Sequence, residues 1–279
     1  MTTGGAIAIA PPDRGRARRP PGGERTVTIH VYTMVWNEEA ILPYFLRHYG
    51  GFADRIVAYD NQSSDRTPEI LRGHPKVEAI TLDSGGVLHE AALMALRNQV
   101  WKGSRGEADW VVIVDADEFL YHEDVRGYLG ACRAAGVTMP LTQGYEMVGD
   151  AFPTGPGQIY DEVRAGVVDP SGQYSKLAAF DPVAIVETNY SPGGHFAEPT
   201  GRVVHGGRRD LKFLHYRYFG ADHLARRWAL LRARLSEFNL RMGFGSHYHA
   251  PREEVAERFA RYRAEAAPVV GPDCARGTA

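Results

Sequence analysis

The strongest constraint on the fold is an alternation of apolar runs and helical segments between residues 26 and 119. Four runs rich in β-branched and aromatic residues are typical of strands buried on both faces: 26–36, 54–60, 76–83 and 110–119. Segments with helical periodicity separate them, and in the second of these we expect Thr67 as N-cap and Pro68 as the first helical residue. The alternation predicts an α/β fold with an open, doubly wound and mainly parallel sheet, which binds ligands at the carboxyl ends of its strands.

The chain divides into segments of different character. Residues 1–25 are rich in Gly, Pro and Arg without apolar periodicity, which predicts a disordered, solvated tail. Residues 26–123 form the regular half, whereas residues 124–220 are dense in Gly and Pro and predict an irregular α+β insert of loops and added strands. Residues 221–279 predict C-terminal helices and a tail, beginning with one long basic amphipathic helix over about 221–241.

Composition limits the partners and the compartment. The 279 residues carry a formal net charge of -2, so no global field favours nucleic acid as a partner. The only two cysteines, Cys132 and Cys274, lie far apart without the spacing of a metal site, which indicates a reducing compartment. No stretch approaches the roughly 20 apolar residues of a membrane span. We therefore expect a cytoplasmic protein without a transmembrane segment, either soluble or loosely peripheral to a membrane.

Three carboxylates lie within four positions at the end of the fourth apolar run: Asp115, Asp117 and Glu118. Carboxylates this close repel one another unless a cation neutralises them, and a divalent metal does so best. In an extended chain Asp115 and Asp117 point to the same side, so the pair could share one ion. Oxygen ligands without a nearby cysteine favour Mn²⁺ or Mg²⁺. The alternative is a carboxylate-rich loop that merely ends the strand.

A fourth carboxylate, Asp60, ends the second apolar run in the polar turn "DNQSSDRT". Because parallel strands end at one edge of a sheet, we expect Asp60 at the same edge as Asp115 and Asp117. There a carboxylate could accept a hydrogen bond from a nucleobase N–H or a ribose hydroxyl. The alternative is an Asx turn that caps the following helix.

These motifs carry a resemblance to a known family. The stretch "TMVWNEEAILPYFLRHYGGFADRIVAYDNQSSDRTPEIL", followed by "LRNQV" and "WVVIVDADEF", resembles the nucleotide-sugar domain of GT-A glycosyltransferases, close to family 2. The resemblance spans roughly residues 26–123 and rests on several ordered motifs. It implies a GT-A fold, a nucleoside diphosphate sugar such as a UDP- or GDP-sugar as donor, and a divalent cation as cofactor.

The resemblance also implies roles for residues in the donor site. The first strand end corresponds to the stretch that lines the nucleotide pocket: Met34, Trp36, Asn37 and Glu38. Trp36 occupies the place of an aromatic residue beside the base. Asp60 corresponds to the carboxylate that recognises base or ribose, and Arg97 to a basic residue that approaches the diphosphate.

The metal site follows from the same resemblance. Asp115, Ala116 and Asp117 correspond to the DxD motif, whose cation bridges the two phosphates of the donor. His215, in "LKFLHYRYF", resembles the late histidine that completes the metal shell of many GT-A enzymes. For His215 the alternative is a core histidine bonded to backbone.

The catalytic base has no clean motif in the irregular half. An inverting transfer needs a carboxylate or imidazole within reach of the acceptor hydroxyl, opposite the leaving diphosphate. The candidates are Asp181, Glu187, His195 and Glu198. We favour His195 and Glu198 in "GGHFAEP", because the two glycines permit close backbone approach, with an ordinary turn as the alternative. Four cationic side chains could meet phosphate or an anionic acceptor: Lys176, His205, Arg208 and Arg217.

The sequence therefore predicts a metal-dependent glycosyltransferase that moves a sugar from a nucleoside diphosphate to an acceptor hydroxyl, with inversion. The acceptor could be a small molecule, a glycan or a lipid-linked sugar. A haloacid-dehalogenase-like phosphatase or phosphotransferase is a rival, against which Phe119 and the three strand–helix units before Asp115 argue. A non-catalytic sugar-nucleotide-binding protein is the remaining class.

Overall fold

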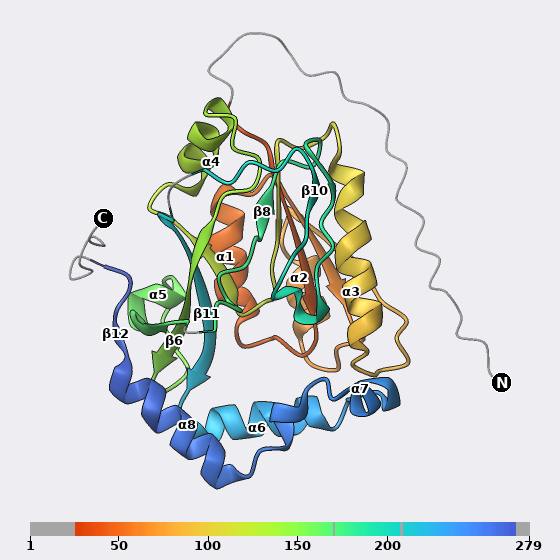
Figure 1. The fold of residues 1–279 in the computed structure, drawn as a ribbon. Coiled ribbons are helices and arrows are strands. Elements are labelled where there is room, and N and C mark those ends of the chain that lie inside the picture. Colours follow the sequence, from red (N-terminus) through yellow and green to blue (C-terminus); the bar gives the residue numbers. More distant parts are fainter. Residues whose placement is uncertain (1–25, 170, 207–208, 272–279) are drawn as a thin grey trace, which may run out of the picture.

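The computed structural model describes residues 26–169, 171–206 and 209–271, and it contains two five-stranded sheets (Figure 1). The predicted tail, residues 1–25, and Cys274 lie outside the described residues. The first sheet has the order β3-β2-β1-β4-β8, in which all pairs are parallel except β4 with β8. Its strands are β1 (Ile29–Val35), β2 (Arg55–Asp60), β3 (Val77–Thr81), β4 (Trp110–Ile113) and β8 (Ala179–Phe180). The predicted α/β fold with a mainly parallel sheet is confirmed.

Helices connect the parallel strands, as the periodicity predicts. They are α1 (Leu42–Phe52), α2 (Thr67–Arg72), α3 (Glu90–Gln99) and the 3₁₀ helix η1 (Val100–Ser104). The expectation that Thr67 caps α2 is wrong, because Arg66 occupies the N-cap position and Thr67 is already helical. The Thr67 hydroxyl instead accepts the backbone N–H of Glu38 at 2.8 Å. Thr67 thereby ties α2 to the loop that follows β1.

The second sheet is mixed and has the order β12-β7-β6-β11-β5. Its central strand, β11 (Leu211–Phe219), runs parallel to β6 (Thr142–Gly149) and antiparallel to β5 (Glu118–Tyr121). The remaining elements of this half are β7 (Ala165–Val168), β12 (Ala267–Pro268), α4 (Val125–Ala134), α5 (Ile159–Glu162), η2 (Pro192–Gly194) and the hairpin of β9 (Ile185–Glu187) and β10 (Thr200–Gly201). The predicted irregular α+β insert is therefore present.

The chain leaves the first sheet and enters the second at the acidic motif. The expectation of one strand over 110–119 is wrong, because β4 ends at Ile113 and β5 begins at Glu118. The chain between them turns, and the N–H of Glu118 donates to the carbonyl of Asp115 at 3.1 Å. The two aspartates thus lie in a connection between sheets and not along one extended strand.

Helix α1 fixes this connection from behind. The Tyr49 hydroxyl donates to the carbonyl of Glu118 at 2.8 Å and accepts the N–H of Leu120 at 2.9 Å, while His48 Nε2 contacts the carbonyl of Leu120 at 3.0 Å. Both rings also pack against Phe119. Because these residues are buried, α1 holds the start of β5 rigidly and with it the acidic motif.

The C-terminal segment forms an arm across one end of both sheets. It contains α6 (Ala221–Arg232), α7 (Glu237–Met242), η3 (Ser246–His249) and α8 (Arg252–Glu265), drawn in blue in Figure 1. The expectation of one helix over 221–241 is wrong, because the chain breaks between α6 and α7 to pair with Leu88. The N–H of Leu88 donates to the carbonyl of Arg234 at 2.7 Å, and Ser236 N–H donates to the carbonyl of Leu88 at 3.0 Å.

Candidate functional site

A cavity of about 360 Å³ lies at the carboxyl ends of the parallel strands. The strand ends and α3 contribute Met34, Trp36, Glu38, Asn61, Arg97, Asp115, Ala116, Asp117 and Glu118 to its wall. The irregular half and β11 contribute Tyr174, Lys176, Gly193, His195, His215 and Arg217. The C-terminal arm closes it with Leu224, Arg227, Trp228, Leu231, Arg234, Phe244, His247 and Tyr248. Three segments distant in sequence therefore build one site.

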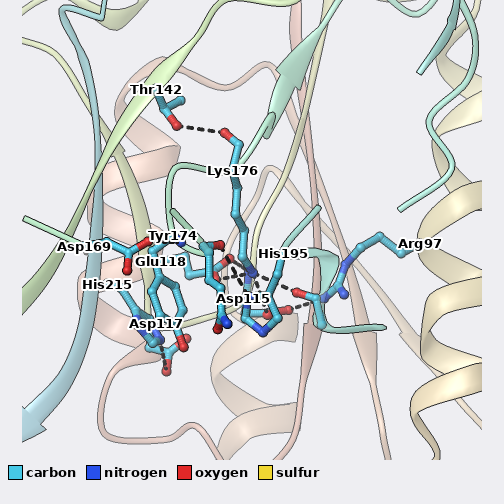
Figure 2. A network of polar contacts seen from close by, with 12 residues as sticks. Arg97, Asp115, Asp117, Glu118, Thr142, Asp169, Tyr174, Lys176, His195 and His215 are labelled. Carbon is cyan, nitrogen blue, oxygen red and sulfur yellow. Dashed lines mark hydrogen bonds and ion pairs between the residues drawn. The ribbon is translucent and has the colours of Figure 1, made fainter. Parts of the chain in front are cut away.

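Asp115 is held by two fixed cations (Figure 2). Arg97 Nη2 lies 2.6 Å from Asp115 Oδ1, and Lys176 Nζ lies 3.7 Å from Oδ2. Lys176 also contacts Glu118 Oε1 at 2.5 Å, and the other Glu118 oxygen accepts the N–H of Asp115 at 2.9 Å. Burial raises the pKa of Glu118, whereas the charge of Lys176 acts in the opposite direction. These contacts form a buried network that sets the conformation of the acidic motif.

The glycines of "GGHFAEP" bring the loop backbone into this network. Gly193 and Gly194 have φ values of +71° and +66°, which glycine adopts without strain. The carbonyl of Gly193 accepts a hydrogen bond from Lys176 Nζ at 2.8 Å. A Cβ atom on Gly194 would lie 3.0 Å from the Arg97 side chain. The two glycines therefore let the loop backbone lie directly against Arg97 and Lys176.

Asp117 meets a different set of partners. Its Oδ2 lies 3.4 Å from His215 Nε2, and His215 Nδ1 lies 2.8 Å from Glu146 Oε2. The second Glu146 oxygen pairs with Arg217 Nη2 at 2.6 Å. Burial opposes the charged forms of both His215 and Asp117, but their charged neighbours outweigh it. Glu146 and Asp117 raise the pKa of His215 to about 9. His215 and Arg227 lower the pKa of Asp117 to about 2.

The His215 ring is oriented on its other side as well. Tyr174 stacks on it with a centroid distance of 4.3 Å and an interplanar angle of 18°. A Cβ atom on Gly144 would lie 2.3 Å from the backbone of Tyr174, so only glycine lets the Tyr174 segment approach β6. His215 is thus a buried ring fixed by one carboxylate and one aromatic face, with Nε2 directed at Asp117 (Figure 2).

This donor set can be compared with the needs of a divalent cation. Within the described ranges, no group of three or more His, Cys, Asp or Glu side chains is arranged to hold a metal ion. Asp117 Oδ2 and His215 Nε2 nevertheless face each other across 3.4 Å. Glu146 binds the opposite ring nitrogen, which is the contact that commonly orients metal-ligating histidines. Two protein ligands fit a cation that takes its other ligands from substrate and water.

In the part of the cavity wall next to β1, arginines of the arm contact the loop after β1. Arg227 pairs with Glu38 and donates to the carbonyl of Asn37 at 3.2 Å. Burial raises the pKa of Glu38 to about 7, although Arg227 opposes the shift. The guanidinium of Arg234 lies over the Trp36 ring, 3.8 Å from its centroid. Asn37 itself bonds Ser63 and Ser64 and does not line the cavity.

Asp60 lies beside this end but is covered. It is 5% exposed, its Oδ1 accepts the N–H of Ser63 at 3.1 Å, and it does not line the cavity. Its neighbour Asn61 does line it, and the Oδ1 atom of Asn61 is buried without a hydrogen-bond partner. The role predicted for Asp60 in base or ribose recognition stays a prediction.

The four candidates for the catalytic base differ in their position relative to the cavity. Only His195 lines the cavity, and its Nδ1 contacts the carbonyl of Gln173 at 3.3 Å. Asp181 accepts the N–H groups of Val183 and Ala184, and Glu187 pairs with Lys102. Glu198 lies in the same loop as His195 but outside the cavity wall. The geometry therefore brings together His195 and the acidic motif and leaves the other three carboxylates aside.

The remaining cationic candidates also separate. Lys176 and Arg217 lie in the cavity wall, His205 bonds the carbonyl of Met139 away from it, and Arg208 lies outside the described residues.

The sequence analysis missed four residues that contact the predicted site residues: Glu146, Tyr174, Arg227 and Arg234. For Arg227 a signal exists, because it lies between Leu224 and Leu231 on the stripe of α6 that faces the cavity, whereas Arg234 lies beyond the end of α6.

Comparisons with solved structures give distant similarities. Glucosyl-3-phosphoglycerate synthase from Mycobacterium tuberculosis, in complex with Mn²⁺, UDP and phosphoglyceric acid, is 18% identical over 43% of this chain and 43% of that chain, with a TM-score of 0.30. S. aureus TarS 1–349 is 13% identical over 84% of this chain and 70% of that chain, with a TM-score of 0.36. The match thus spans less than half of the mycobacterial chain. No curated protein sequence matches this chain significantly.

The family comparison is more direct. Residues 31–166 match the model of glycosyl transferase family 2. This range includes most of β1 and all of β2 to β6, and therefore the loop after β1, the turn at Asp60, helix α3 with Arg97, and the acidic motif. No helix within 26–169, 171–206 and 209–271 combines the length and the apolar character that crossing a membrane requires. Residues 31–166, just under half of the chain, are thus similar to glycosyl transferase family 2.

Proposed function

We propose that this protein is a glycosyltransferase that depends on a divalent cation and transfers a sugar from a nucleoside diphosphate to an acceptor hydroxyl with inversion. The observation that carries the proposal is the pair Asp117 and His215, which face each other at 3.4 Å in the cavity that also contains Asp115. Mn²⁺ or Mg²⁺ suits a carboxylate and an imidazole that share a site with phosphate oxygens. UDP- and GDP-sugars are the donors we would test first.

Asp117 and His215 would hold the cation, and His215 would lose its proton on binding. Glu146 stabilises the orientation of the His215 ring in both states, because its carboxylate bonds Nδ1. A cation held by these residues would supply Lewis-acid stabilisation of the charge on the leaving diphosphate. Asp115 supports this arrangement, since Arg97 and Lys176 fix its carboxylate beside the site.

His195 is the best-placed base for the acceptor. Burial, together with the charge of Lys176, lowers its pKa to about 4, so the imidazole is neutral at pH 7. Because Nδ1 contacts the carbonyl of Gln173, Nε2 is the nitrogen left to accept a proton. In the transfer the acceptor oxygen bonds the anomeric carbon, the carbon–oxygen bond to the diphosphate breaks, and the acceptor proton passes to His195. The acceptor could be a small molecule, a glycan or a lipid-linked sugar, and we place the protein in the cytoplasm.

The direct experiment measures release of nucleoside diphosphate from UDP- and GDP-sugars with Mn²⁺, with Mg²⁺ and with a chelator. We expect release with one nucleotide class and a loss of release in chelator. Metal-independent release would refute the cation role, and binding without release over hours would indicate a non-catalytic sugar-nucleotide-binding protein. For the base, His195→Gln should lower kcat while the Kd of the nucleotide stays unchanged. A selective effect on Kd would assign His195 to donor binding.

A further inference from the structure

The Trp36 ring already has a stacking partner within this chain. The guanidinium of Arg234, in the break between α6 and α7, lies 3.8 Å from the ring centroid. Two hydrogen bonds hold it there: Nε donates to the carbonyl of Gly86 at 2.7 Å, and Nη2 donates to the carbonyl of Asn61 at 3.2 Å. One face of the indole is therefore covered by the arm.

The Trp36 ring lies in the wall of the cavity at the carboxyl ends of the parallel strands, the edge at which such sheets bind nucleotides. Trp36 follows β1 and Asn61 follows β2, and these strands pair in parallel up to Val35 and Asp60. Both residues line the cavity, whereas Asp60 beside them does not. A nucleobase binds an indole by stacking on an open face, which is worth a substantial part of its affinity. A base therefore cannot stack on this face while Arg234 remains on it.

Two features would help a nucleobase to replace the Arg234 guanidinium on the Trp36 ring. A second guanidinium, that of Arg227, lies 6.0 Å from the same ring centroid, so two cations share one indole and repel each other. In addition, the buried Oδ1 of Asn61 has no hydrogen-bond partner. A buried acceptor without a partner is costly, and an N–H group of a nucleobase in the place of Arg234 could satisfy it.

We infer that Arg234 competes with the nucleobase for Trp36 and thereby sets the affinity for the donor nucleotide. This inference rests on the proposed function, because it assumes that a nucleotide binds at this sheet edge. Donor binding then requires the guanidinium to leave the indole, and the arm of the chain limits how tightly the nucleotide is held. Arg227 remains paired with Glu38 and can keep the arm docked meanwhile.

The test is a titration of UDP and of GDP, in the presence of Mn²⁺, by isothermal calorimetry. The variants are Arg234→Ala and Arg234→Gln, of which the second keeps an amide donor for the carbonyls of Asn61 and Gly86. The control is Arg232→Ala, because Arg232 is exposed at the end of α6. We expect both Arg234 variants to bind the preferred nucleotide about fivefold more tightly or better, since a cation–π contact no longer has to be broken. The control should match the wild type.

A second comparison isolates the indole. In a Trp36→Leu background the removal of Arg234 should leave the Kd of the nucleotide unchanged, because the indole for which Arg234 and the nucleobase compete is no longer present. Unchanged or weaker nucleotide binding in Arg234→Gln would overturn the inference and make Arg234 a wall or a direct contact of the site. If neither UDP nor GDP binds the wild type or any variant, the proposed function fails and the inference fails with it. Arg234→Gln decides the matter should Arg234→Ala not fold.

Discussion

Two neighbouring carboxylates of the acidic motif have environments of opposite kind. Asp115 is bound by two basic side chains, Arg97 and Lys176, which are almost completely buried. Asp117 is bound by His215, whose charge depends on a proton that a metal can replace. The motif therefore combines a carboxylate committed to structure with a carboxylate that is available to a ligand. Identical residue types two positions apart need not share one role.

The largest expected effect distinguishes the two carboxylates by activity. Asp117→Asn removes the carboxylate that faces His215 Nε2, so the release of nucleoside diphosphate should fall by about 10³-fold or more. The thermal midpoint should change little, because the amide still accepts a hydrogen bond from His215. The measurement is kcat at saturating Mn²⁺ together with a melting curve. A variant that retains more than a tenth of wild-type kcat would assign the cation to another place.

Loss of Lys176 should produce the largest effect on stability. Lys176→Met leaves Glu118, which is 2% exposed, without its main cation, and it also removes the hydrogen bond to Gly193. Breaking a buried ion pair on one side should cost about 3 kcal/mol in the free energy of unfolding. Urea denaturation measures this cost, with exposed Arg232→Met as the control. Equal midpoints for the two variants would mean that the network around Asp115 is not structural.

Asp115→Asn should cost less, about 2 kcal/mol, because Arg97 keeps a neutral acceptor and lies near Glu118 and Glu90. Read beside Asp117→Asn, this variant should show the reverse pattern, with a lower unfolding midpoint and a smaller loss of kcat. Denaturation and turnover are measured on the same preparation. A loss of kcat equal to that of Asp117→Asn would show that both carboxylates hold the cation.

The smallest effect concerns the support behind both carboxylates. Burial lowers the pKa of His48 to about 4, so the unfolded chain binds more protons than the folded protein below pH 6.5. Neutral His48 therefore makes its full contribution to the free energy of unfolding above pH 6.5, and this contribution is lost as the pH falls toward 4. Between pH 7 and pH 5 the loss is about 2 kcal/mol. In urea denaturation, the free energy of unfolding should differ less between pH 7 and pH 5 for His48→Gln than for the wild type. Parallel pH profiles would contradict this assignment.

Much of the first sheet could be predicted because its strands and helices are encoded by local periodicity. The four apolar runs and the polar turns after them place Asp60, Asp115 and Asp117 at one edge, and the structure agrees for all three, although of these only Asp115 and Asp117 line the cavity. The strand predicted over 110–119 failed because β5 pairs with β11, almost a hundred residues later. Local pattern does not encode such pairing.

The missed partners depend on similar long-range contacts. Glu146 reaches His215 only through the register of β6 against β11, which opposes these two residues. The arm breaks before α7 although Ala233, Arg234 and Leu235 are good helix formers, because the chain there pairs with Leu88. Arg234 and Trp36 are nearly two hundred positions apart, so neither the stack nor its consequence for the nucleobase is visible in the sequence.

The most direct test of the division between the two carboxylates is a crystal grown with Mn²⁺ and the preferred nucleoside diphosphate, with the metal located by anomalous scattering. We predict one Mn²⁺ bound by Asp117 Oδ2 and His215 Nε2, with the diphosphate on its open side and Asp115 still paired with Arg97. A manganese peak at Asp115 with His215 unbound, or a nucleotide bound away from this cavity, would contradict the account.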